Sequence, residues 1–103
     1  MIVRLDADGA VVADADDCST VHVESGLDPD GLRTALVTTG TGAPAGPDAV
    51  VLDIAVLRSR ARLLATAPDW SECFDQMMDQ AVDRLTDDGL GLRVPVEQVG
   101  EQN

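Results

Sequence analysis

The chain of 103 residues contains no Lys and no Tyr, and it has one Trp, one Phe and one His. Without Lys, seven Arg are its basic side chains against 19 Asp and Glu, so the formal net charge at pH 7 is −12. A surface of this charge repels phosphate backbones and anionic membranes, which argues against direct binding to nucleic acid or to a membrane. Two explanations of the acidity stay open: a GC-rich genome and adaptation to high salt.

Cysteine is also scarce, with Cys18 and Cys73 as the two examples. They form no C-x-x-C pair and no disulfide framework, so free thiols in a reducing compartment are expected. No apolar run approaches the roughly 20 residues that span a bilayer. Residues 1–9 have neither the basic region nor the long apolar run of a signal peptide. These absences predict a cytoplasmic protein.

Catalytic and metal-binding motifs are missing as well. The sequence has no G-x-S-x-G, no H-E-x-x-H and no zinc ligand set. An EF-hand would need a Glu six residues after Gly9, where Ala15 stands. The Gly-rich residues 41–48 follow a predicted helix, whereas phosphate loops follow a strand and open a helix. We therefore predict no catalytic residue, metal or cofactor, with weak ion binding by residues 14–17 as an open alternative.

The residues that are present describe an aliphatic core. Apolar residues make up 45% of the chain, and nearly all of them are Ala, Val, Leu and Ile. A domain of this length buries roughly 60–70% of the surface of its unfolded chain, which is enough for a core without disulfides. We expect one domain over residues 1–98 and a flexible C-terminal tail over residues 99–103.

The first half of the chain reads as a hairpin, a strand and a helix. Asp8-Gly9 between alternating apolar residues predicts a two-residue turn that pairs Leu5 with Val12. Residues 20–24 alternate as a short strand. A helix should then begin at Asp28, followed by Pro29 at its first position, and Gly40 should end it.

The second half adds a buried strand over residues 49–55, a short helix from about Val56, a long helix over residues 69–85 and a strand over residues 91–97. Pro95 predicts that the last strand lies at an edge, since it has no N–H to donate. The predicted fold is a two-layer α+β sandwich. It has a mixed sheet of four to five strands, an N-terminal hairpin then β-α-β-α-β, with two main helices on one face.

The long helix has two contrasting sides. We predict an Asp-led capping box with Asp69 as the N-cap and Glu72 three residues later. A wide apolar stripe follows, whose members are Trp70, Cys73, Phe74, Met77, Met78, Ala81, Val82 and Leu85. The other side carries unpaired acids at helical spacing, which are Glu72, Asp75, Asp79 and Asp83. Core packing explains the stripe, while the acids form either a solvated face or a docking surface for a basic partner.

The positive charges also cluster, at Arg58, Arg60 and Arg62. Guanidinium groups pair bidentately with carboxylates, so these Arg suit nearby acids, the acidic helix of a second subunit or a small anion. Our leading hypothesis is a non-catalytic protein-interaction or self-associating domain, with a homodimer or another protein as the partner. The alternative is an anionic-ligand binding protein or minor enzyme with a pocket near Arg58, Arg60 and His22.

Overall fold

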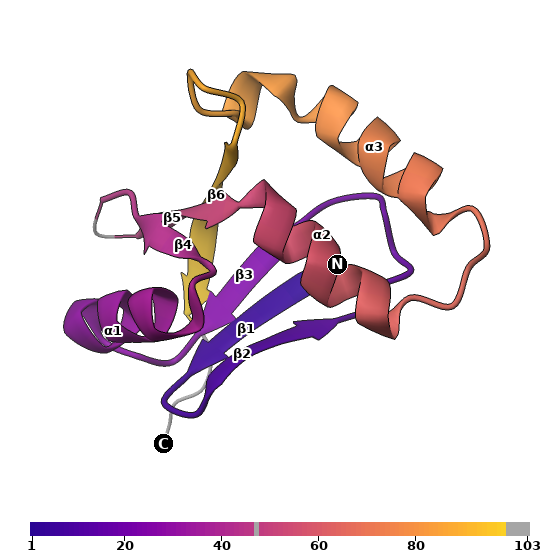
Figure 1. Cartoon of the computed structure of the whole chain (residues 1–103). Coiled ribbons are helices and arrows are strands. Elements are labelled where there is room, and N and C mark those ends of the chain that lie inside the picture. The colour runs from indigo at the N-terminus through magenta and orange to yellow at the C-terminus, as the bar shows by residue number, and fades with distance from the viewer. Residues whose placement is uncertain (47, 99–103) are drawn as a thin grey trace.

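The computed structural model describes residues 1–46 and 48–98 (Figure 1). The tail predicted at residues 99–103 lies outside them. Within the described residues there are three α-helices, a short 3-10 helix and six strands. In chain order they are β1 (Ile2–Asp6), β2 (Gly9–Ala13), β3 (His22–Ser25), α1 (Pro29–Thr39), β4 (Gly42–Pro44), β5 (Ala49–Asp53), α2 (Ile54–Leu64), α3 (Trp70–Gln80), η1 (Val82–Arg84) and β6 (Gly91–Gln98).

The strands form one mixed sheet in the order β2-β1-β3-β6-β5-β4. The central pairs β1–β3 and β3–β6 are parallel, while the β1–β2, β6–β5 and β5–β4 pairs are antiparallel. This arrangement confirms the predicted α+β class and the mixed sheet. Because α1 contacts both β2 and β4, which lie at opposite edges, the sheet curls around the core and is not the flat layer of a simple sandwich.

The predicted number of strands was too low, because β4 lies in the stretch expected to be a loop. Its pairing with β5 depends on Gly42, where a Cβ atom would collide with the carbonyl of Val51. Glycine is therefore needed here for a close approach of two backbones, and composition alone does not separate this role from a turn.

The number of main helices was also too low, because α2 is as long as α1 and α3 at 11 residues. It follows β5 without a loop, and Asp53 makes the junction. This residue ends the strand, and its side chain accepts a hydrogen bond of 3.1 Å from the backbone N–H of Val56. The acid that interrupts the apolar run of β5 is thus the N-cap of α2.

The N-terminal hairpin is confirmed, but its register is different from the one predicted. Leu5 pairs with Ala10 and Asp6 with Gly9, so the two-residue loop is Ala7-Asp8. The side chain of Asp6 supports this loop by accepting 2.9 Å from the backbone N–H of Asp8. The pairing is shifted by two residues, from Val12 to Ala10 opposite Leu5, so Val3, Leu5 and Val12 keep their predicted buried side.

Strand β6 lies in the middle of the sheet, so the predicted edge position of Pro95 was wrong. Residues 91–95 pair with β5, and residues 96–98 pair with β3. Pro95 stands where the strand changes partners. The N–H of the next residue, Val96, points toward β5 and bonds to Asp48 at 2.7 Å. Backbone donors alternate along a strand, so the nitrogen of Pro95 faces the β3 side just before that pairing begins.

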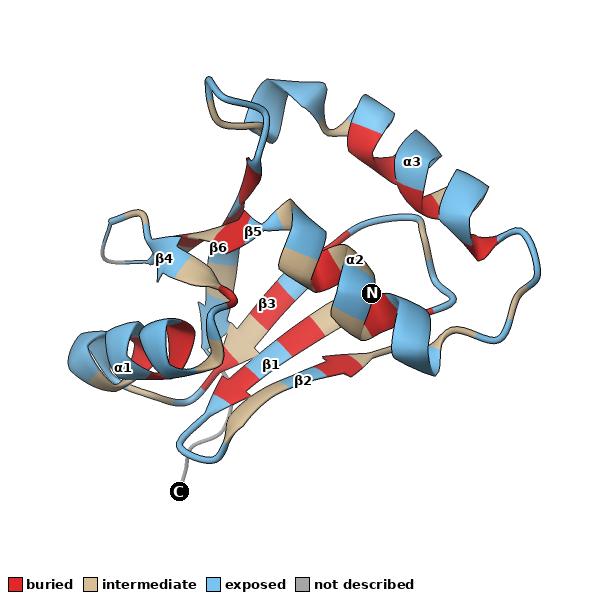
Figure 2. Ribbon diagram, in the orientation of Figure 1, coloured by how far each residue is buried: buried red, intermediate tan, exposed pale blue. Residues whose placement is uncertain are grey.

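Helix α1 agrees with its sequence signals. Asp28 accepts 2.7 Å from the N–H of Gly31, and Gly40 adopts the left-handed conformation with φ of 68°. The helix and α2 bury their apolar residues against the same side of the sheet, where the buried side chains of the strands collect (Figure 2). No described helix is long and apolar enough to cross a membrane.

Candidate functional site

Helix α3 packs its apolar stripe into the core and leaves its acids outside. Trp70, Phe74, Met77 and Met78 are 3%, 0%, 3% and 9% exposed, so the core-packing interpretation of the stripe is confirmed. They pack beside α2 and the loop over residues 14–21, at one end of the sheet (Figures 1 and 2). These four side chains of the stripe are thus covered within the chain.

Both ends of α3 differ from the prediction. Asp69 makes no capping hydrogen bond, because its ψ of 18° lies outside the extended region from which an N-cap side chain reaches the first turn. The helix also ends at Gln80, so Val82 is 66% exposed and not part of the buried stripe. Acids at the negative end of a helix dipole disfavour its continuation, and the chain tightens into η1.

The predicted acids are all exposed, on α3 and the turn that follows. Glu72, Asp75 and Asp79 lie on α3, whereas Asp83 lies on η1. Asp75 pairs with Arg58 of α2, and this is the one ion pair that these acids make among the described residues. The structure therefore leaves all four acids exposed and pairs one of them, Asp75, with an Arg.

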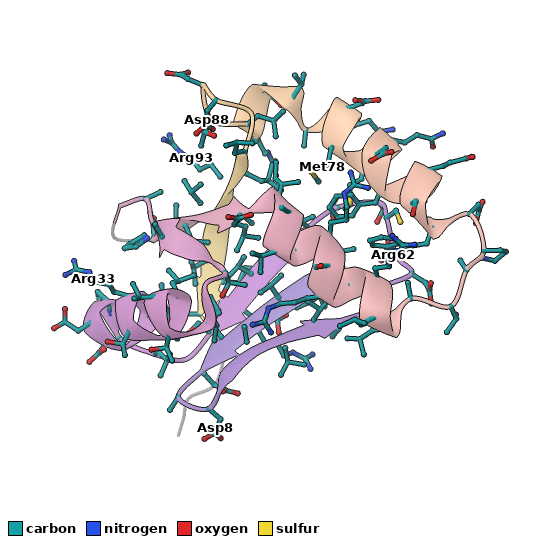
Figure 3. All side chains as sticks on the ribbon, viewed as in Figure 1. Asp8, Arg33, Arg62, Met78, Asp88 and Arg93 are labelled. Carbon is teal, nitrogen blue, oxygen red and sulfur yellow. The ribbon has the colours of Figure 1, made fainter. Side chains whose placement is uncertain are left out.

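The Arg residues fan out around α2, as expected for a helix. The guanidinium of Arg58 lies 4.7 Å from the centre of the Phe74 ring as well as against Asp75. Arg60 donates to two backbone carbonyls, that of Thr39 at 3.1 Å and that of Ala10 at 3.4 Å. Arg62 is exposed on α2 in Figure 3. Among the described residues, Arg58 thus connects α2 to α3, and Arg60 connects α2 to β2 and α1. These contacts point in different directions and do not form one ligand site.

Arg60 has a further structural role at the open edge of the sheet. The hairpin register directs the N–H and C=O groups of Ala10 away from β1, toward solvent. The bond from Arg60 occupies that carbonyl. A side chain that covers an unpaired edge lowers the tendency of the strand to pair with another chain.

His22 lies apart from the Arg cluster, on the other face of β3, and the anionic-ligand alternative stays a prediction. On β3, Val23 and Ser25 are buried toward the helices, and the alternation of the strand turns His22 to the opposite face. There its ring lies 3.0 Å from the carboxylate of Glu97 and 2.8 Å from the hydroxyl of Thr20. Because the sheet separates it from α2, His22 cannot act together with Arg58 or Arg60.

A cavity of about 270 Å³ lies at the C-terminal end of α3, and of the four predicted acids it is Asp83 that lines it. Its apolar lining comes from Val21, Met77, Met78, Ala81 and Leu92, and its polar lining from Ser19, Thr20, Gln80, Asp83 and Arg84. We call this cavity and the acids Glu72, Asp75, Asp79 and Asp83 the α3 site. The sequence pointed to the acids but not to Ser19, Thr20, Val21 or Leu92, which reach the cavity only through the tertiary fold.

Three exposed carboxyl groups elsewhere hold loops in place. The pKa of Asp16 is lowered by hydrogen bonds from the backbone N–H groups of Ala67 and Thr66 and from the Thr66 hydroxyl. Ser19 lowers the pKa of Asp17, and Thr86 together with the N–H of Leu90 lowers that of Asp88. Each carboxylate is stabilised in its charged form by donors within a turn or linker, as structural acids are.

Within the described part of the chain, no three His, Cys, Asp or Glu side chains gather in a metal-binding group. Comparisons with protein-family models, with curated proteins and with solved structures found no match to the chain.

Proposed function

We propose that the chain is a non-catalytic protein-interaction domain whose α3 site binds a basic partner. The observation that carries the proposal is that exposed Asp83 lines a cavity with an apolar floor, just beyond the helix that carries the other three exposed acids. The acids attract Arg or Lys side chains, and the cavity accepts an apolar side chain or the stem of an Arg. A cytoplasmic setting belongs to the proposal, since both cysteines are free thiols.

The charge arrangement supports this proposal because it opposes folding in isolation. Glu72, Asp79 and Asp83 make no ion pair among the described residues, so their charges repel one another without local compensation. The net charge of −12 adds repulsion over the whole surface. A partner with clustered positive charges removes these costs on binding, and its approach is accelerated by the long-range attraction.

The cavity supplies the second part of the recognition. Met77 and Met78 line it, and the flexible thioether side chain of Met adjusts to different apolar groups. Binding energy in protein interfaces concentrates where a side chain enters such a pocket, while surrounding charges mainly set orientation and rate. The partner predicted by this site is a basic surface with an apolar side chain at its centre.

Isothermal titration with an arginine-rich peptide that contains one Leu tests the proposal. We compare the wild-type chain with the triple variant Glu72→Gln, Asp79→Asn and Asp83→Asn, which retains Asp75 and its ion pair. The proposal predicts that Kd rises about tenfold, a loss of about 1.4 kcal/mol of binding free energy.

The control is the triple variant Asp8→Asn, Asp30→Asn and Asp48→Asn, which removes the same three negative charges at exposed positions outside the α3 site. This variant should bind within about twofold of the wild type at physiological salt, where distant charges are screened. An equal loss of affinity in the two triple variants would mean that the peptide senses only net charge, which contradicts a defined α3 site.

Self-association is a second candidate, favoured by the exposed apolar residues at the end of α2. Leu63 and Leu64 are 86% and 55% exposed. Two neighbouring leucines in water gain free energy by burial against another chain. Light scattering at moderate salt should show a dimer in the wild type and a monomer in Leu63→Gln, Leu64→Gln. A strict monomer at high protein concentration would remove this candidate.

A further inference from the structure

The fold brings together the two cysteines, which lie 55 residues apart in the sequence. Cys18 belongs to the loop over residues 14–21, and Cys73 lies on α3. The two side chains are close enough that Cys73 contributes to the raised pKa of the Cys18 thiol. Both residues are free and half-buried, so neither is sealed in the core.

Other contacts hold the same loop against α3 and the segment before it. The indole N–H of Trp70 donates 2.6 Å to the carbonyl of Ala15 in a buried position. The carboxylate of Asp16 accepts from the N–H of Thr66 at 2.9 Å and from that of Ala67 at 3.0 Å.

The two cysteines are equally far along the chain from the hydrogen bond between Trp70 and Ala15. Cys73 follows Trp70 by three residues, about one helical turn, and Cys18 follows Ala15 by three residues. The loop and the helix therefore run past one another with a thiol from each at their contact.

From this geometry we propose that Cys18 and Cys73 are a site of reversible oxidation that forms a disulfide between the loop and α3. Neighbouring thiols, one on a loop and one on a helix held against it, need only a local movement to reach the S–S distance of about 2.05 Å. The oxidant is a peroxide of low molecular weight, and a dithiol reductant restores the thiols.

The reaction proceeds in two balanced steps with hydrogen peroxide. The Cys73 thiolate attacks one peroxide oxygen, the O–O bond breaks and hydroxide leaves, which gives a sulfenic acid. The Cys18 sulfur then attacks the Cys73 sulfur, the S–O bond breaks, and the thiol proton leaves with the hydroxyl group as water. Two electrons pass from the two thiols to the peroxide.

The environment of Cys18 assigns the order of these steps. Burial is the main cause that raises the pKa of the Cys18 thiol to about 12, and the neighbouring Cys73 adds to it. A thiol with a raised pKa is the poorer nucleophile toward peroxide, so Cys18 is assigned the second, resolving step.

A disulfide here also changes the α3 site. Ser19 and Thr20 follow Cys18 directly and line the cavity from one side, and Met77 lies one turn beyond Cys73 on the other. The crosslink fixes these two walls together. It also restricts the unfolded chain, so the oxidised form should unfold at a Tm on the order of 10 °C higher. Neither consequence depends on the partner proposed above.

The test treats the purified full chain with hydrogen peroxide and analyses it by intact mass and non-reducing peptide mapping. We expect a monomer that has lost two hydrogen atoms, with Cys18 and Cys73 in one linked peptide pair, and reversal by dithiothreitol. Chains linked only to one another, or Cys73 driven to sulfinic acid without a Cys18 link, would overturn the proposal.

Two controls separate the fold's contribution from ordinary thiol chemistry. In concentrated urea the link should form at least tenfold more slowly, and an equal rate in urea would also overturn the proposal. The variant Ser71→Cys, Cys73→Ser moves the thiol to an exposed position on the same helix. It should not link to Cys18 in the folded chain, and efficient linkage there would mean that the native position of Cys73 is not decisive.

Discussion

Arg58 on α2 and Asp75 on α3 form an ion pair, and the Arg58 guanidinium also lies 4.7 Å from the centre of the Phe74 ring. One side chain thus joins the two helices through a carboxylate and an aromatic face. Arg suits this double contact because its planar guanidinium stacks on a ring while its N–H groups donate to an acid.

We predict that Arg58→Ala lowers the free energy of unfolding by about 1–2 kcal/mol, since it removes the ion pair and the contact with Phe74. Asp75→Asn should cost less than about 1 kcal/mol, because the paired side chains are 39% and 59% exposed and water screens the interaction. Urea denaturation of both variants and of the double variant checks this. Equal losses in the two single variants would show that the ring contributes nothing.

Arg60 and Arg62 provide a matched pair of substitutions. Arg60→Gln should cost about 2 kcal/mol, because the carbonyls of Thr39 and Ala10 lose a charged donor in a half-buried place. Arg62→Gln should stay within about 0.5 kcal/mol, as is usual for an exposed side chain. Urea denaturation measures both, and a larger effect at Arg62 would contradict the structural role assigned to Arg60.

The N-caps of α2 and α3 should respond differently to the same change. Asp53→Ala removes the bond to the N–H of Val56 and should cost about 1 kcal/mol. Asp69→Ala should be nearly neutral, since Asp69 makes no capping bond. Thermal unfolding of the two variants decides the point. A clear loss of Tm at Asp69 would mean that the predicted capping box forms in solution.

Asp16 should contribute to acid sensitivity. Hydrogen bonds from Ala67 and Thr66 hold its pKa below the usual 3.8 in the folded chain. A lowered folded-state pKa adds stability above the unfolded pKa and loses it as the pH falls from there through the folded pKa. The Tm of the wild type should therefore drop more steeply below about pH 4 than that of Asp16→Ala.

Helix α1 and the apolar stripe of α3 were predictable because their signals are local. Asp28, Pro29 and Gly40 satisfy the backbone groups at the helix ends by themselves. The spacing of Trp70 and Phe74 puts both on one side of any helix, and burying that side is favourable in any arrangement of the fold. The acids of α3 were found for the same reason, since the spacing that buries the stripe exposes them.

The features that depend on distant neighbours were not predictable in this way. Pro95 weakens a strand wherever its missing N–H is needed, and only the exchange of partners along β6 removes that need. Gly42 was assigned to a loop because its close contact with the Val51 backbone involves a segment beyond it in the chain. The separation of His22 from Arg60 likewise follows from the curled sheet that lies between them.

The sequence by itself determined the α+β class, the places where α1 and the buried strands lie, and the two-sided character of α3, because periodicity and capping act over a few residues. Only the tertiary structure decided which acids find an Arg, which residues complete the cavity beside them, and that Cys18 meets Cys73. Those relationships join segments far apart in the chain, and their geometry exists only once the sheet has curled and the helices have packed on it.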